Sequence, residues 1–242
     1  MKKVGVLLIL ITGFLSFLYY YWYQATQLPQ WYAQSHQSFQ NVDRKVLETP
    51  QPNQENIEAK IEATINKSHT SKNIEVKFNE REVNHLVVSK MGETPDSRRL
   101  LAATKGFNTK IQDGTLSTGA VINISEIPVD KLETSEQAAI AKIIQTFPAL
   151  KNQDVYIGVE GKPIVEKGQL KLDDNTKVKL GNLSFTVSEL ANQLGIPKAK
   201  LEQKINLELQ LGRLKVSDIE LTGNNAVVKG SVSQTPQLKN QS

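Results

Sequence analysis

The sequence predicts an α+β protein: a single N-terminal transmembrane helix, followed by a largely antiparallel, curved sheet packed on amphipathic helices. Three observations support this fold class. An uncharged apolar segment occupies residues 4–23. Short segments that alternate apolar and polar residues, as half-buried strands do, recur between residues 73 and 232. Amphipathic helical patterns stand between groups of these strands, which favours antiparallel strands with helices inserted between them.

The N-terminal segment has the length of a membrane span. Residues 4–23 contain no charge and follow Lys2 and Lys3. As a helix they would be about 30 Å long, which matches the hydrocarbon core of a bilayer. The lysines predict a cytoplasmic end at residues 1–3, and the aromatic cluster at the far end suits the membrane interface. A cleaved signal peptide is the alternative, but the candidate cleavage sites lack the required small residues. We therefore expect a single-pass protein of the cell membrane with an extracytoplasmic C-terminal part, in a periplasm or lumen.

The composition argues against several function classes. The chain has no cysteine, so disulfides and thiolate sites are excluded. Its net charge of +4 is mixed along the chain, whereas nucleic-acid binding calls for a concentrated basic face. Its three histidines do not have the spacing of a helical metal site, and neither a Gly-x-Ser-x-Gly elbow nor a Gly-rich phosphate loop occurs. We therefore predict a non-enzymatic protein with no metal, no cofactor and no nucleic-acid partner.

Residues 24–72 predict a stalk, because they are rich in Gln and Ser and are interrupted by prolines. Trp31 and Tyr32 either rest in the lipid headgroup region or belong to a short helix that packs on the domain. A helix is expected after Asn53, where isoleucines recur at every fourth residue and share one face.

The exported domain is predicted at residues 73–233, before a polar, disordered tail at 234–242. In its first half, Pro95 at a first helical position and Gly106 past the end bracket one helix. Gln112-Asp113-Gly114 forms the turn of a hairpin. The elements expected here are a strand at 74–78, helices at 79–91 and 95–105, strands at 107–111 and 116–124, and a helix at 134–147.

The second half of the domain consists mostly of strand patterns. The parity of the apolar positions shifts near Gly212 and again near Asp218, which predicts a turn and a β-bulge. The expected elements are strands at 155–159, 170–172, 178–180 and 183–185, helices at 188–194 and 197–204, and a meander of strands at 205–211, 214–221 and 226–232.

Two strand-to-helix junctions share the pattern Phe-[Asn/Thr]-x-x-Glu-[Val/Leu], at residues 78–83 and 185–190. The pattern predicts a capping box, in which the Asn or Thr side chain and the Glu side chain each accept a hydrogen bond from the other residue's backbone. The predicted structural caps are Asn79, Glu82, Thr186 and Glu189. A duplicated strand–helix unit is one interpretation, and a chance coincidence of two common caps is the other.

The runs Phe78–Asn84 (Phe-Asn-Glu-Arg-Glu-Val-Asn) and Leu221–Gly230 (Leu-Thr-Gly-Asn-Asn-Ala-Val-Val-Lys-Gly) resemble those of bacterial envelope proteins of the LmeA-like and YpmS-like types. The resemblance covers residues 73–232. It implies a tubular lipid-binding type of domain, with a curved sheet wrapped on a long helix around an apolar groove for phospholipid. It implies no catalytic residue.

The leading expectation for function is binding or transfer of a lipid or other amphiphile at the cell envelope, close to the membrane that holds the anchor. The expected groove residues are Val155, Ile157, Leu207 and Leu209. A fully packed core would produce the same alternating pattern. The alternative is therefore a non-enzymatic scaffold or interaction domain for another envelope protein.

Overall fold

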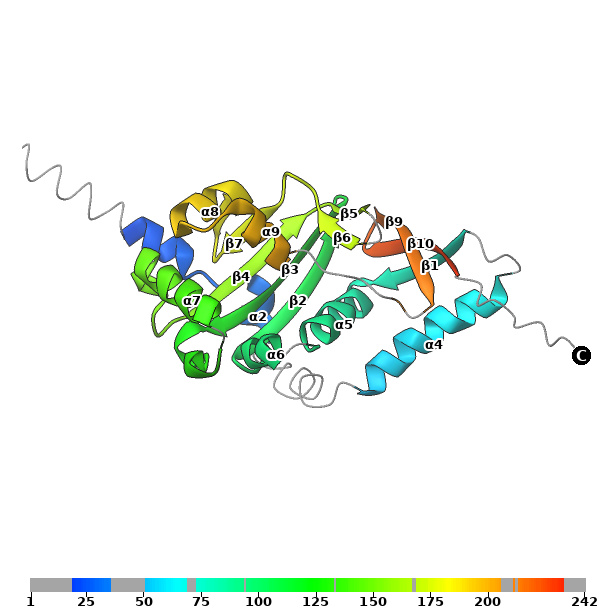
Figure 1. Ribbon diagram of the computed structural model, residues 1–242, viewed down its shortest axis with the longest axis horizontal. Coiled ribbons are helices and arrows are strands. Elements are labelled where there is room, and N and C mark those ends of the chain that lie inside the picture. Colours follow the sequence, from blue (N-terminus) through cyan, green and yellow to red (C-terminus); the bar gives the residue numbers. More distant parts are fainter. Residues whose placement is uncertain are drawn as a thin grey trace, which may run out of the picture.

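The computed structural model describes residues 19–35, 51–68, 73–93, 95–132, 134–166, 169–205, 211 and 213–232 (Figure 1). The described chain is α+β, and each of its paired strands is antiparallel. A three-stranded sheet has the order β1-β10-β9, a five-stranded sheet the order β2-β3-β4-β7-β8, and a small sheet consists of β5 and β6. The antiparallel α+β part of the predicted fold class is thus confirmed.

The elements have the following bounds. The strands are β1 Ile74–Asn79, β2 Thr104–Gln112, β3 Thr115–Asn123, β4 Asp154–Gly161, β5 Pro163–Glu166, β6 Gln169–Leu172, β7 Lys177–Leu180, β8 Leu183–Thr186, β9 Leu214–Thr222 and β10 Asn225–Val232. The helices are α2 Gln30–Ser35, α4 Gln51–Lys67, α5 Glu80–Met91, α6 Pro95–Ala102, α7 Thr134–Thr146, α8 Val187–Leu194 and α9 Lys198–Ile205. Short 3₁₀ turns lie at η1 Ile124–Glu126, η2 Val129–Lys131 and η3 Pro148–Leu150.

The transmembrane helix in the predicted fold class is a wrong prediction. None of the helices in the described part of the chain combines the length and the apolar character needed to span a bilayer. Residues 4–18 of the expected span lie outside that part. Residues 19–25 are helical and contact the domain: Tyr21 packs against its core, and Ala25 is buried there. A Cβ added at Gly181, in the β7–β8 turn, would lie 2.4 Å from the carbonyl oxygen of Ala25. Tyr21 and Ala25 thus serve protein packing, which a hydropathy pattern does not distinguish from insertion into lipid, whereas the aromatic side chains of Tyr19, Tyr20, Trp22 and Tyr23 are exposed.

The expected stalk region supplies two helices that pack on the rest of the chain. In α2, Trp31 and Tyr32 lie against Tyr156 of β4, and the rings of Trp31 and Tyr156 are 6.3 Å apart and nearly perpendicular. Burial raises the pKa of the Tyr156 hydroxyl above its ordinary value. In α4, Ile57 and Ile61 are buried in a hydrophobic core. Of the two expectations for Trp31 and Tyr32, the structure has the short helix that packs on the domain.

Besides the small cluster of Tyr32, Val121 and Tyr156, two large hydrophobic clusters lie in the described chain, one toward each end of its long axis (Figure 1). The first core joins α4 and α5 to the three-stranded sheet and to the far ends of β2 and β3; Phe78 is its largest fully buried side chain. The second core joins α7 and α8 to the five-stranded sheet and includes Leu150, Val155 and Phe185. The long strands β2, β3 and β4 connect the two ends.

A bend divides one long hairpin into two sheets. β4 continues through Lys162 into β5, and β6 returns through residues 173–176 into β7. At the bend Lys162 N–H donates to Asp173 Oδ1 at 3.2 Å, and Asp173 N–H donates to the Lys162 carbonyl at 3.0 Å. Buried Thr176 packs so closely under Gly161 that a Cβ there would lie 2.5 Å from Thr176 Oγ1. The β5–β6 hairpin therefore leaves the five-stranded sheet and lies beside β9.

Two details of the meander follow the sequence pattern. Leu211 bridges to Leu214, as a turn between these two residues requires, and Gly212 itself lies outside the described residues. The β9–β10 register then shifts between Lys229 and Gly230, so that Ser217 has no partner and forms the predicted bulge beside Asp218.

The helix that was expected to reach Gly106 ends earlier. α6 stops at Ala102, and Gly106 lies within β2. A Cβ at Gly106 would be 3.2 Å from the Tyr32 ring. This glycine therefore permits close approach of α2, and it is not a helix stop.

Candidate functional site: a groove between β9 and the β5–β6 hairpin

Two of the four groove residues predicted from the sequence, Val155 and Ile157, belong to the second core. Val155 is fully buried, and Ile157 is partly buried and packs against the same cluster. Leu207 and Leu209 lie outside the described residues. Neither Val155 nor Ile157 contributes to the hollow described below.

The four suggested cap residues form two complete capping boxes. Asn79 Oδ1 accepts from Glu82 N–H at 3.0 Å, and Asn79 N–H donates to Glu82 Oε2 at 2.8 Å. At the second junction, Thr186 Oγ1 accepts from Glu189 N–H at 3.1 Å, and Thr186 N–H donates to Glu189 Oε2 at 2.8 Å. These contacts hold the helix N-termini, and Glu82 also pairs with Lys60 of α4 at 2.6 Å.

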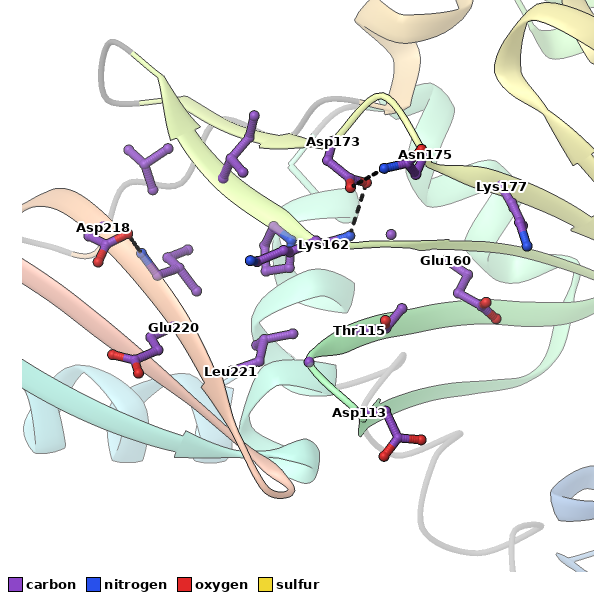
Figure 2. A pocket seen from close by; sticks show the side chains of 16 residues that line it. Asp113, Thr115, Glu160, Lys162, Asp173, Asn175, Lys177, Asp218, Glu220 and Leu221 are labelled. Carbon is purple, nitrogen blue, oxygen red and sulfur yellow. Dashed lines mark hydrogen bonds between the residues drawn. The ribbon is translucent and has the colours of Figure 1, made fainter.

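A half-open groove of about 910 Å³ lies where the three sheets meet (Figure 2). This volume falls in the range of small-molecule sites, about 300–1,000 Å³. The lining comes from the β2–β3 turn (residues 113–115), the β4–β5 bend (160–165), the β6–β7 turn (Asp173, Asn175 and Lys177) and β9 (218–221). We call this hollow the groove.

The bulge in β9 shapes one wall of the groove. Before the bulge, Leu214 and Val216 are buried in the first core. After it, the apolar parity is reversed, and Ile219 and Leu221 are only partly buried and line the groove. The Ser217 hydroxyl donates to the Lys229 carbonyl at 3.3 Å and holds the bulged residue. The bulge absorbs the shift in parity: Ile219 pairs with Val228 and Leu221 with Ala226, so both stay on the core face of the sheet. They pack against the edge of the first core, where they also line the groove.

The opposite wall is the β5 strand, which contributes two more aliphatic side chains. Val165 is partly buried against the first core, whereas Ile164 is 41% exposed and is one of the large exposed hydrophobic side chains of the described chain. With Ile219 and Leu221, they form the aliphatic strip of the groove, defined as Ile164, Val165, Ile219 and Leu221.

Most carboxylates around the groove already have a donor. Glu160 pairs with Lys179, and Glu220 pairs with Lys229 at 2.7 Å. The hydrogen bond from Lys229 holds the pKa of Glu220 below its ordinary value. Asp218 lies 3.8 Å from the same lysine. The carboxylate of Asp173 accepts the Lys162 backbone N–H described above and the Asn175 amide N–H at 3.3 Å. Asp113, in the β2–β3 turn, also lines the groove.

The ammonium groups of Lys162 and Lys177 are in a different situation. Both side chains are exposed and line the groove. Within the described chain neither has a carboxylate at ion-pair distance, because Glu160, opposite Lys177 in the ladder that extends from β4 to β7, is engaged by Lys179. Figure 2 shows Lys162 extending across the groove toward β9.

The described residues contain no cluster of three or more His, Asp or Glu side chains that could hold a metal ion. Of the histidines, His85 lies on α5 outside the groove lining, while His36 and His69 are outside the described residues. The groove lining offers hydrogen bonds, five carboxylates, two lysines and aliphatic contact.

Sequence reasoning missed the groove because it missed β5. A signal for that strand is present in the sequence: Gly161 and Pro163 indicate a break in the chain, and the β-branched residues Ile164 and Val165 follow. A strand of four residues at a bend leaves too short an alternation to be recognised from the pattern alone.

Compared with family models, with curated proteins and with solved structures, the chain shows no significant match. The resemblance to LmeA-like and YpmS-like proteins therefore stays a prediction.

Proposed function

We propose that the protein is a non-enzymatic binding domain that takes up a lipid or other amphiphile in the groove. The observation that carries this proposal is the aliphatic strip beside a polar rim: exposed Ile164 and partly buried Ile219 line the hollow from two different sheets, and charged residues of both signs and turn residues surround them. An amphiphile has the same two-part chemistry. The site differs from the one suggested by Val155 and Ile157, which are packed in the second core.

The expected affinity is modest because the groove is half open. Burying one methylene contributes about 0.8 kcal/mol. A chain that buries about eight methylenes on the strip would gain roughly 6 kcal/mol, from which the cost of ordering the ligand is subtracted. We therefore expect dissociation constants of roughly 10 μM or weaker for a single chain.

A native mass spectrometry titration with dodecanoate tests the proposal. Ile164→Ser and Ile219→Ser remove parts of the strip, and Ile196→Ser removes a partly buried isoleucine at the second core as a matched control. We expect adducts with the wild type and the control, and weaker adducts with the two groove variants. Equal binding by all four proteins would place the ligand elsewhere.

An interaction domain for another protein is the second candidate, and the sheet order favours it. β9 is an outer strand of the three-stranded sheet, and β5 pairs only with β6 within the described chain. Such strand edges can accept an extended peptide as an added strand. Hydrogen exchange separates the candidates, because an added strand would slow exchange of alternate β9 amides, whereas an alkyl chain would leave those amides without a new acceptor.

A further inference from the structure

We propose that the β5–β6 hairpin is a flap over the groove, which swings about the bend at residues 161–162 and 173–176 to admit the ligand and then to cover it. This inference rests on the proposed function and adds the movement by which the groove opens. Three features of the hairpin support it: its attachment, its packing and its separation from β9.

The hairpin is attached to the five-stranded sheet at one end. β5 and β6 have four residues each, and within the described chain they pair only with each other. Residues 161–162 on one strand and 173–176 on the other separate their ladder from the ladder that β4 forms with β7. A small sheet that is joined to a larger one through such a short segment can move as a unit.

The bend supplies a hinge. Lys162 N–H donates to Asp173 Oδ1 at 3.2 Å, and Asp173 N–H donates to the Lys162 carbonyl at 3.0 Å. The buried Thr176 hydroxyl donates to the Asp173 carbonyl at 2.6 Å and fixes the turn. These contacts hold the two strands together at the bend. The direction of the hairpin beyond it then depends on the backbone angles of a few residues, as it does in hinges.

Few apolar side chains hold the described part of the hairpin to the rest of the molecule. Pro163 is buried next to the hinge, where a rotation displaces it least. Val165 is partly buried against the first core, whereas Ile164 is 41% exposed and lines the groove. Opening the hairpin therefore uncovers little apolar surface, and closing it over an alkyl chain covers Ile164.

Two features keep β5 from joining the free edge of β9. The two strands lie side by side, but no ladder joins them within the described chain. Pro163, the first residue of β5, has no N–H to donate. In β9, the Ile219 N–H already donates to Asp218 Oδ1 at 2.9 Å. A continuous ladder would close the groove permanently, so these two residues leave its walls able to separate.

The experiment uses the absence of cysteine from the chain. Val165→Cys places one thiol where the hairpin packs on the first core, and Val232→Cys, at the end of β10, replaces a matched valine that packs on the same core. The rate at which a maleimide labels the full-length protein reports how often each side chain is uncovered. Each cysteine is combined with three changes in the turn. Asp173→Ala removes the carboxylate acceptor at the hinge, Asp173→Asn keeps an acceptor oxygen, and Asp174→Ala changes an exposed aspartate of the same turn as the control.

We expect Asp173→Ala to accelerate labelling at residue 165 by about two- to tenfold, which corresponds to the loss of one hydrogen bond, and to leave labelling at residue 232 unchanged. Asp173→Asn and Asp174→Ala should leave both rates unchanged. Dodecanoate at ten times its dissociation constant should slow labelling at residue 165 about tenfold, because the ligand binds the closed state.

Labelling at residue 165 that does not respond to Asp173→Ala, or that rises equally at residue 232, would overturn the flap. Protection by dodecanoate would in that case still support the proposed function. Labelling that depends on the hinge but is not slowed by dodecanoate would keep the flap and overturn the proposed function.

Discussion

The junctions β1–α5 and β8–α8 have the same sequence pattern and the same cap, but the chain uses them differently. Each strand lies at the edge of its sheet and enters its helix through a complete capping box. Glu82 of the first box also accepts from Lys60 of α4 at 2.6 Å. Glu80, beside it, accepts from the Ile111 N–H of β2 at 2.8 Å. Glu189 of the second box contacts the backbone and the hydroxyl of its own cap residue, Thr186.

The ends of the two helices differ as well. α5 ends at Gly92, whose backbone is right-handed with φ −72°. α8 ends at Gly195 in the left-handed region with φ 64°, and Ile196 N–H then donates to the Ala191 carbonyl at 3.0 Å. The strand partners differ too, because β1 pairs with distant β10 and β8 with adjacent β7. The shared unit is therefore limited to strand, cap and helix start. Local sequence determines the cap, and the surrounding chain determines everything beyond it.

The largest expected effects come from the phenylalanine that precedes each cap. Phe78 is 0% exposed in the first core and Phe185 is 6% exposed in the second. Phe78→Ala should lower the free energy of unfolding by about 3–5 kcal/mol, and Phe185→Ala by an amount toward the lower end of that range. Urea denaturation followed by circular dichroism measures the loss.

Hydrogen exchange on the same variants shows whether the two cores open separately. We expect Phe78→Ala to accelerate exchange mainly in β1, β9 and β10, and Phe185→Ala mainly in β7, β8 and α8. Uniform acceleration in both variants would mean that the cores unfold as one unit, and the contrast between the junctions would then be confined to local contacts.

The two helix ends should respond differently to substitution by alanine. Nothing surrounds a Cβ at Gly195, so Gly195→Ala adds only the cost of a left-handed backbone, about 1 kcal/mol. Gly92→Ala needs no such backbone, although its Cβ would approach the Ser89 carbonyl at 3.3 Å. We expect the midpoint of urea unfolding to fall for Gly195→Ala and to stay nearly constant for Gly92→Ala. Equal shifts would contradict the difference in backbone geometry.

These contrasts show what could be predicted from the sequence. Caps, hairpin turns and alternating strands depend on residues within a few positions of each other, so the pattern at residues 78–83 predicted its capping box without the rest of the chain. The bulge beside Asp218 was predictable for the same reason, because a parity shift is visible within one strand.

The features that sequence reasoning missed depend on distant residues. Gly106 looked like a helix stop, but it makes room for Tyr32, which no local pattern links to it. Residues 19–25 looked like the end of a membrane span because aromatic and apolar residues suit lipid and a protein core equally well. The alternation at Val155 predicted a buried face but could not show whether protein or ligand covers it. The groove itself arises only where β5 meets β9, from segments about 50 residues apart in the chain.

The two caps themselves should contribute similar free energies. Asn79→Ala and Thr186→Ala each remove one acceptor for a backbone N–H, and each should cost about 1 kcal/mol, with the asparagine at the higher end. Thr186→Ser serves as the control because it keeps the hydroxyl. A much larger loss at Asn79 would show that the first cap also supports the contact between α4 and α5. A Lys60–Glu82 double-mutant cycle would measure the coupling free energy of that ion pair, which we expect to be below about 1 kcal/mol.

The smallest expected effect is a pH dependence at the second cap. The backbone and hydroxyl hydrogen bonds of Thr186 hold the pKa of Glu189 below its ordinary value. Because the folded pKa lies below that of the unfolded chain, about 4.3, the stabilisation is fully present above that pH and is lost as the pH falls through the folded pKa. Glu189→Gln keeps a cap without a charge, so the stability difference from the wild type should shrink between about pH 6 and pH 3. Urea unfolding at several pH values measures this difference. If the difference in unfolding free energy between the wild type and Glu189→Gln stays constant over that range, the charge of Glu189 adds nothing to its cap. The two junctions would then differ only in the residues that surround each cap.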